Sequence, residues 1–136
     1  MPPLLIHIAL VAVGSALGGL ARWGVGATAA QWLGTSWPWG TFLINVSGSL
    51  LLGWFLTAVT EWPAATGATA GRTAELRLLV AVGFCGAFTT FSTYEYESHK
   101  LLTGGDGLGG TLYLIGSVAA GLLALRLGVM LARWGG

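Results

Sequence analysis

The stretch Gly83-Phe-Cys-Gly-Ala-Phe-Thr-Thr-Phe-Ser-Thr-Tyr-Glu-Tyr-Glu97 decides how this chain folds. It continues an apolar, uncharged run that begins at Leu78. Its second half nevertheless carries four hydroxyl side chains, on Thr89, Thr90, Ser92 and Thr93. Backbone that leaves helical geometry at membrane depth is tolerated only inside protein or beside a water-lined cavity. The stretch therefore predicts a membrane helix that breaks near Gly86–Thr89.

Aromatic residues recur among these hydroxyls at three-residue spacing, as Phe88, Phe91 and Tyr94. They share one face if the segment after the break is helical. Such stripes usually pack in a core, but ring edges carry partial positive charge and can also face an anion. The break would in addition free backbone carbonyls, which suit a cation. Two interpretations therefore stay open, a packed core and an ion path.

Composition places the whole chain in a membrane. Of its 136 residues, 8% are charged and 54% are apolar, whereas about a quarter of the residues of a soluble domain are charged. So few charges could not cover a soluble surface. The net charge of +1 gives no support for a nucleic-acid partner. We expect a multi-pass protein of the cell membrane, surrounded by the lipid bilayer.

Four apolar segments are long enough to cross a bilayer core, for which roughly 20 residues suffice. They cover residues 3–23, 39–60, 76–102 and 108–134. We therefore predict one all-α membrane domain over residues 1–136, with a broken third helix. The expected connections are Gly24–Pro38, a polar loop over Glu61–Glu75 and a glycine-rich turn over Thr103–Gly110.

Four crossings would place both termini on one side of the membrane. That side would carry Arg72, Arg77 and Arg133, and the other side Arg22 and Lys100. Three positive residues on one side against two on the other is nearly even, so the positive-inside rule hardly favours either orientation of the chain in the membrane. A chain with this little bias can insert both ways and pair as an antiparallel homodimer, and a two-fold interface is the commonest oligomeric solution. A single fixed topology remains the alternative.

Neutral hydrogen-bond donors are expected on three of the four helices. Asn45 lies in the middle of the second helix, and Tyr113 and Ser117 share a face of the fourth at four-residue spacing. Each could simply bond to a neighbouring helix, which is common in membranes. Together with Thr90 and Thr93 they form a set of donors without counter-charges, which suits an anion better than a cation.

Two charged residues could lie at the ends of such a path. Glu97 shares a face with Thr90 and Thr93. It could act as a gate, as a proton site or as an acceptor that anchors the helix, unless it faces lipid headgroups. Arg22 closes the first segment and could line an anion vestibule or snorkel to phosphates. The sequence shows no nucleophile beside a base, no phosphate loop and no acidic metal cluster, so we do not expect an enzyme.

Three motifs resemble those of the Fluc (CrcB) fluoride channels. Gly-Phe-Cys-Gly-Ala-Phe followed by Thr-Thr-Phe-Ser-Thr-Tyr, over residues 83–94, resembles the signature of the third helix in that family. Trp-Pro-Trp-Gly-Thr followed by Asn45 resembles the start of the second helix and the pore asparagine. The segment from Gly18 to Trp23, which contains Arg22, resembles the end of the first helix. The likeness extends over all four helices.

The resemblance implies an antiparallel, dual-topology homodimer that lets fluoride leave the cytoplasm passively through two pores. It also implies a structural sodium ion (Na⁺) at the dimer centre, bound by the backbone carbonyls of Gly86 and Thr89. Phe91 and Tyr94 match the paired pore aromatics of the family, and Glu97 matches its third-helix glutamate. The residues that match its polar pore lining are Asn45, Ser92, Thr93, Tyr113 and Ser117.

Two positions depart from the family pattern. Tyr94 stands where a phenylalanine is usual, so its ring edge is kept and a hydroxyl is added. Gly121 stands where a serine is usual on the fourth helix, so one donor of the polar lining is absent or replaced by water.

Two other classes of membrane protein remain as alternatives. A small, dual-topology, proton-coupled multidrug exporter would need a carboxylate deep in its first helix, and Met1–Trp23 contains none. A non-transporting membrane subunit would have no need for four hydroxyls around a helix break.

Overall fold

The computed structural model describes residues 3–61 and 70–135, and these residues form helices without any strand. In chain order they are α1 (Pro3–Leu33), α2 (Trp39–Glu61), α3 (Ala70–Leu76), η3 (Arg77–Cys85), α4 (Gly86–Phe88), α5 (Phe91–Thr103) and α6 (Gly107–Trp134). Four helical stretches are long and apolar enough to cross a membrane: α1, α2, the composite Gly71–Thr103 and α6. The predicted all-α fold with a broken third crossing is confirmed.

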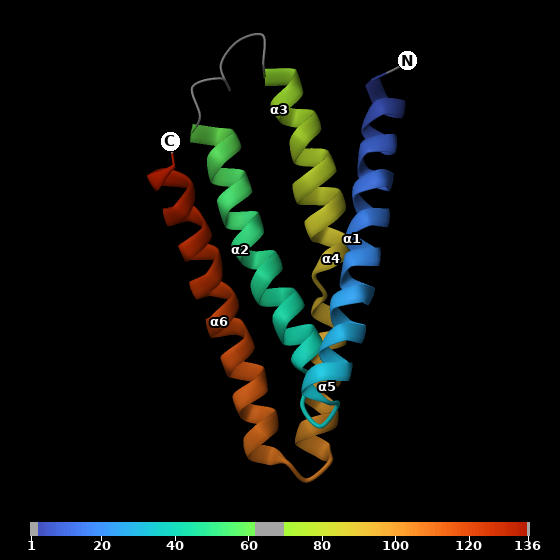
Figure 1. Ribbon diagram of the computed structural model, residues 1–136, viewed down its shortest axis with the longest axis vertical. Helices are drawn as coiled ribbons and strands as arrows, with labels where there is room; N and C mark the ends of the chain where they lie inside the picture. Colours follow the sequence, from blue (N-terminus) through green and yellow to red (C-terminus); the bar gives the residue numbers. More distant parts are fainter. Residues whose placement is uncertain (1–2, 62–69, 136) are drawn as a thin grey trace.

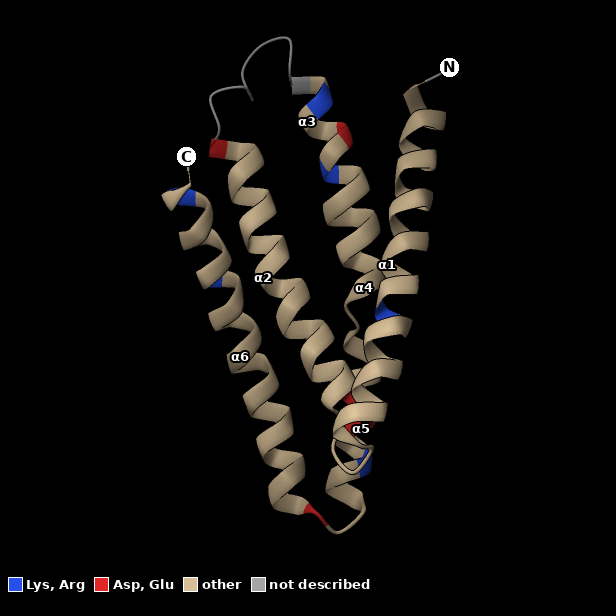
Figure 2. Ribbon diagram, in the orientation of Figure 1, with Lys and Arg blue, Asp and Glu red and all other residues tan. Residues whose placement is uncertain are grey.

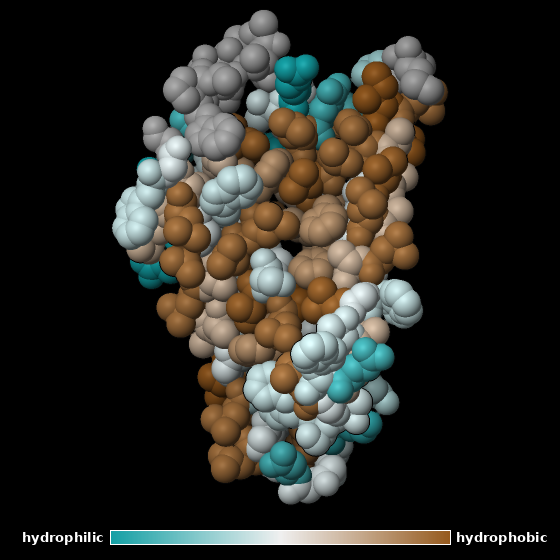
Figure 3. Space-filling model, viewed as in Figure 1, coloured by the Kyte–Doolittle hydropathy of each residue, from teal (hydrophilic) through white to brown (hydrophobic). Residues whose placement is uncertain are grey.

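The four crossings lie side by side along one long axis (Figure 1). Both termini, the end of α2 and the start of α3 lie at one end, and the α1–α2 and α5–α6 connections lie at the other. α2 packs chiefly against α6, and α1 packs chiefly against η3 and α4. Charged residues gather toward the two ends (Figure 2), and the face shown in Figure 3 is mostly hydrophobic between them. This distribution suits a protein whose middle lies in hydrocarbon.

The first helix is longer than predicted. The prediction ended it at residue 23, but the structure continues it to Leu33, where Gly34 follows with a φ of 79°. No proline or left-handed residue interrupts the chain earlier, so the helix continues through what was expected to be a connection. Arg22 therefore lies inside α1 and not at its end. Of the predicted polar loop, residues 70–75 belong to α3 and residues 62–69 lie outside the described part.

The third crossing changes geometry twice. Residues Arg77–Cys85 form a π-helix, whose wider turns often occur at functional sites. The helix then stops at Thr89 (φ −80°, ψ 160°) and Thr90 (φ −149°, ψ 122°), which are extended. It resumes at Phe91, and the Thr90 hydroxyl oxygen caps the new helix by accepting from the Thr93 N–H at 3.3 Å. The extended residues lie at the C-terminal edge of the region in which the break was predicted.

Glycines let the helix backbones approach closely. A Cβ at Gly14 would overlap the Leu79 carbonyl oxygen of η3, and one at Gly128 would overlap the Leu50 carbonyl oxygen of α2. Backbone cannot move aside as a flexible side chain can, so these contacts require glycine. Close packing of small residues is a main source of helix association in membranes, where lipid is as apolar as the protein.

A matched pair of substitutions on α6 tests this packing. Gly128→Ala should lower stability by about 1–3 kcal/mol, because the added methyl pushes α6 away from α2. Gly116→Ala should be neutral or slightly stabilising, because no atom of a neighbouring helix lies within 4 Å of the position that its Cβ would take and alanine favours helix. Thermal unfolding of the purified protein in detergent measures both. Equal midpoints for the two variants would contradict the packing interpretation.

Candidate ion path

Asn45 of α2 holds the broken backbone of the third crossing. Its Nδ2 donates to the Thr90 carbonyl oxygen at 2.9 Å, and its Oδ1 accepts from the Thr90 N–H at 2.8 Å. One amide side chain thus satisfies both backbone groups of an extended residue at membrane depth, where water would otherwise be needed. Each amide nitrogen carries two donors, so the second N–H of Asn45 is not used by Thr90.

The break also releases a backbone carbonyl. In a continuous helix the Thr90 N–H would donate to the Gly86 carbonyl, but here it donates to Asn45. The Thr89 hydroxyl does not replace this lost donor, because it donates to the Cys85 carbonyl at 2.9 Å and not to the Gly86 carbonyl. A cavity of about 280 Å³ opens beside the break, lined by Asn45, Gly48, Ser49, Leu52, Ala81, Cys85, Gly86, Thr89, Thr90 and Phe91.

The groups at the break would suit a hard cation better than a transition metal. No group of three or more His, Cys, Asp or Glu side chains that could hold a metal occurs in residues 3–61 and 70–135. Oxygen ligands are instead available from the Gly86 and Thr89 carbonyls, and hard cations prefer such oxygens. Two carbonyl oxygens from one chain do not complete the coordination shell of a dehydrated cation, so further oxygen ligands would be needed.

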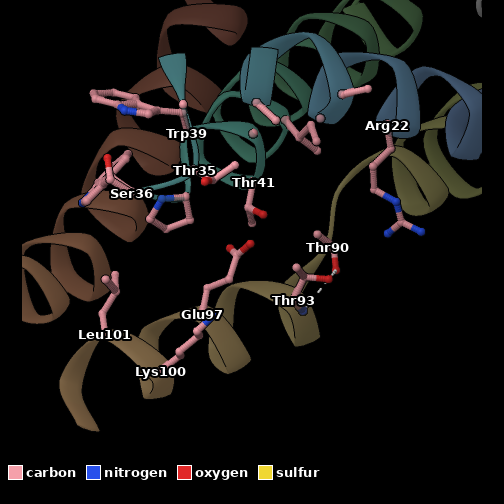
Figure 4. A pocket seen from close by; sticks show the side chains of 18 of the residues that line it. Arg22, Thr35, Ser36, Trp39, Thr41, Thr90, Thr93, Glu97, Lys100 and Leu101 are labelled. Atoms are coloured by element: carbon pink, nitrogen blue, oxygen red, sulfur yellow. Dashed lines mark hydrogen bonds between the residues drawn. The ribbon is translucent and has the colours of Figure 1, made fainter. Parts of the chain in front are cut away.

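A larger cavity of about 630 Å³ opens on the other side of Thr90. We call it the vestibule. Half-buried Arg22 from α1, Thr41 from α2, and Thr93, Glu97 and Lys100 from α5 line it. Figure 4 shows Arg22 reaching from α1 and the Glu97 carboxylate projecting into the space between the helices. In the lining of the vestibule, the Thr90 hydroxyl donates to the Thr93 hydroxyl at 3.0 Å.

Glu97 is bonded to a buried tyrosine on α6. The Tyr113 hydroxyl donates to Glu97 Oε2 at 2.8 Å, and Tyr113 is 0% exposed. Trp37, from the connection between α1 and α2, packs edge-on against the Tyr113 ring with centroids 5.1 Å apart. The sequence allowed Glu97 to be an acceptor that anchors the helix, and the hydrogen bond from Tyr113 is one that such an acceptor would form. Trp37 lies in the expected connection Gly24–Pro38, and no local sequence pattern indicates that it packs against Tyr113.

The aromatic stripe expected along one face is divided by the break. Phe88 ends α4 and stacks on Phe84 with centroids 5.6 Å apart, so it belongs to the packing before the break. Phe91 and Tyr94 lie together on α5, with centroids 5.8 Å apart. The expectation that all three share a face is wrong, because it required a continuous helix from Phe88 onward. The Tyr94 hydroxyl donates to the Leu114 carbonyl of α6 at 2.6 Å.

A third cavity, of about 240 Å³, lies between α2, α5 and α6. Asn45, Ser49, Phe91, Tyr94, Ser117, Val118, Gly121, Leu122 and Leu125 line it, and none of them is charged. Ser117 is 9% exposed, and its hydroxyl is the one buried side-chain polar atom in the described part of the chain that has no hydrogen-bond partner. Such a hydroxyl is costly to bury unless something binds it.

Comparison with known proteins identifies the family. Residues 9–129 match the model of the family described as CrcB-like protein, Camphor Resistance (CrcB). The chain belongs to the CrcB family. A relative from Chloroflexus aurantiacus (strain ATCC 29366 / DSM 635 / J-10-fl), named fluoride-specific ion channel FluC, is 44% identical over 130 residues, which are 96% of this chain and 98% of the relative.

Two further relatives carry the same name. One from Thermus thermophilus is 45% identical over 122 residues, covering 90% of each chain. One from Synechococcus sp. is 41% identical over 123 residues, covering 90% of this chain and 89% of the relative. The resemblance seen in the three motifs is thereby confirmed. With its four apolar helices, this CrcB protein is a multi-pass protein of the cell membrane, and its family consists of ion channels and not enzymes.

The structure brings together most of the predicted site residues of this CrcB chain. Asn45, Phe91, Tyr94 and Ser117 line the third cavity. The vestibule is lined by Arg22, Thr93 and Glu97. Tyr113 does not line it but donates a hydrogen bond to Glu97, which does. Ser92 is exposed and lines none of these three cavities.

Proposed function

We propose that this CrcB chain forms a passive, fluoride-selective channel through which fluoride leaves the cytoplasm down its gradient. The observation that carries the proposal is the extended Thr89–Thr90 segment bonded to Asn45. Thr90 lines both the vestibule and the cavity at the break. The names of the relatives, fluoride-specific ion channel, support the same choice of anion.

The chemistry of the cavities supports an anion and not a cation as the conducted ion. The third cavity offers the Ser117 hydroxyl and the Asn45 amide as donors and has no carboxylate in its lining. Phe91 and Tyr94 add ring edges, which carry partial positive charge. A small anion that sheds water could exchange its hydration for these groups. The vestibule is lined by Arg22 and Lys100 and also by Glu97 and Asp106, so its formal charges balance and the preference for an anion rests on the third cavity.

We further propose that two copies assemble as an antiparallel, dual-topology homodimer. Phe91 is 69% exposed although it lies in the interior of the third crossing. The cavity at the break opens beside it. A second copy related by a two-fold axis in the membrane plane would cover both features, and closed two-fold interfaces are self-complementary. The flat balance of Arg and Lys between the two ends supports insertion in both orientations.

In this dimer a structural Na⁺ would bind between the two breaks. The Gly86 and Thr89 carbonyls of both copies would supply its oxygens, which completes the cage that one chain leaves too small. The ion would also link the two third crossings at their extended residues. The released Gly86 carbonyl supports this assignment, since it has lost its helical donor.

Ion efflux from liposomes tests the function. Purified protein reconstituted into vesicles loaded with fluoride should release it when a potassium shunt is added, and vesicles loaded with chloride should not respond. Protein-free vesicles give the background. Release of both halides at one rate would contradict selectivity, and absence of fluoride release would contradict the channel.

The same assay separates the alternatives. A proton-coupled multidrug exporter would move an organic cation against a pH gradient, but the described part of α1, Pro3–Leu33, carries no acidic residue. A non-transporting membrane subunit would release neither halide.

A further inference from the structure

Ser49 of α2 lies where two of the cavities meet. Asn45, Ser49 and Phe91 line both the cavity at the break and the third cavity. Ser49 is one helical turn beyond Asn45 and therefore shares its face. Any ion that passes from the break toward α6 along this face would pass beside the Ser49 side chain.

The Ser49 hydroxyl is not bonded to its own helix. A serine or threonine in a membrane helix commonly donates to the carbonyl four residues earlier. Ser47 does so to Leu43 at 2.6 Å, and Ser98 does so to Tyr94 at 2.7 Å. Within residues 3–61 and 70–135, Ser49 forms no hydrogen bond. Its hydrogen is therefore available to a group in the cavity.

Across the third cavity, α6 presents a residue without a side chain. A Cβ placed on Gly121 would lie 3.6 Å from Ser49 Oγ, which is ordinary van der Waals contact. Ser49 thus stands directly opposite the glycine. One turn earlier on α6, the Ser117 hydroxyl is also without a partner among the described residues. Tyr94 has its own hydroxyl occupied by the Leu114 carbonyl, so it contributes only its ring to this cavity.

We propose that Ser49 is an ion-contacting residue of the pore, whose hydroxyl donates to the conducted anion together with Ser117. The inference rests on the proposed function and adds a donor from α2 at a point where α6 has none. The ligand it suits is a small anion that accepts strong hydrogen bonds, because the cavity has two free hydroxyls and no charged side chain. Charge-bearing acceptors strengthen such bonds.

Fluoride efflux from liposomes, compared among the unmodified protein and four variants, tests the assignment. Ser49→Ala should slow efflux about tenfold, the effect expected when one hydrogen bond to an ion in transit is lost. Ser47→Ala is the matched control, because that hydroxyl is bonded to its own helix, and its rate should equal that of the unmodified protein. Gly121→Ser in the Ser49→Ala background should restore most of the rate by supplying the hydroxyl from α6. Gly121→Ala in the same background should not.

The rescue distinguishes a donor from a packing residue, because serine and alanine at position 121 both add a Cβ and only serine adds a hydroxyl. If the unmodified protein conducts fluoride and Ser49→Ala conducts equally well, the inference is overturned and the channel function stands. If the unmodified protein releases no fluoride, the channel function itself fails. Should Ser49→Ala not be recovered as folded protein, Ser49→Cys, a weak donor of similar size, is measured with the same expectation.

Discussion

Asn45→Asp is expected to reduce fluoride efflux about 1,000-fold, to near the background of protein-free vesicles. The substitution places a negative charge on the lining of two cavities. Two unit charges 4 Å apart at an effective dielectric constant of 20 repel by about 4 kcal/mol, and each 1.36 kcal/mol slows a barrier crossing about tenfold. The carboxylate also lacks the N–H that now donates to the Thr90 carbonyl.

Asn45→Ala separates these two effects, because it removes both hydrogen bonds to Thr90 without adding a charge. We expect it to conduct more than Asn45→Asp and less than the unmodified protein. Size-exclusion chromatography and thermal unfolding establish that each variant is folded before its efflux is measured. Efflux through folded Asn45→Asp at the unmodified rate would exclude Asn45 from the ion path.

Complete removal of Na⁺ is expected to abolish fluoride efflux and to weaken the dimer. Without the cation, carbonyl oxygens from both copies would face one another with their partial negative charges uncompensated. The measurement compares efflux and the monomer–dimer equilibrium in sodium salts with those in N-methylglucamine salts, with a chelator of trace Na⁺ present. Full activity in sodium-free solution would contradict the structural ion.

A side-chain variant shows whether the carbonyl is the ligand. Thr89→Ala removes the hydroxyl, which here bonds to the Cys85 carbonyl, and keeps the backbone oxygen. We expect this variant to require Na⁺ as the unmodified protein does. If its activity no longer depends on Na⁺, the hydroxyl and not the carbonyl is the ligand.

Local patterns were sufficient to predict most of the architecture. The long apolar segments predicted four crossings, and the hydroxyls crowded after Gly86 predicted a break in the third. Both signals are local. A membrane-spanning helix needs a long apolar segment, and clustered hydroxyls are unfavourable on a helix that faces lipid. The predicted end of the first helix at residue 23 was wrong, because no proline or left-handed residue interrupts the chain before Gly34.

The sequence by itself determined that this is a membrane protein of four helices, that the third crossing is discontinuous and which polar side chains are available to an ion. Tertiary structure alone decided what those side chains do. Asn45 bonds to a residue 45 positions away, Tyr113 is covered by Trp37, and Ser49 meets Gly121 across a cavity. The physical reason is that hydropathy and periodicity report the solvent around each residue, whereas hydrogen-bond partners depend on which helices pack together.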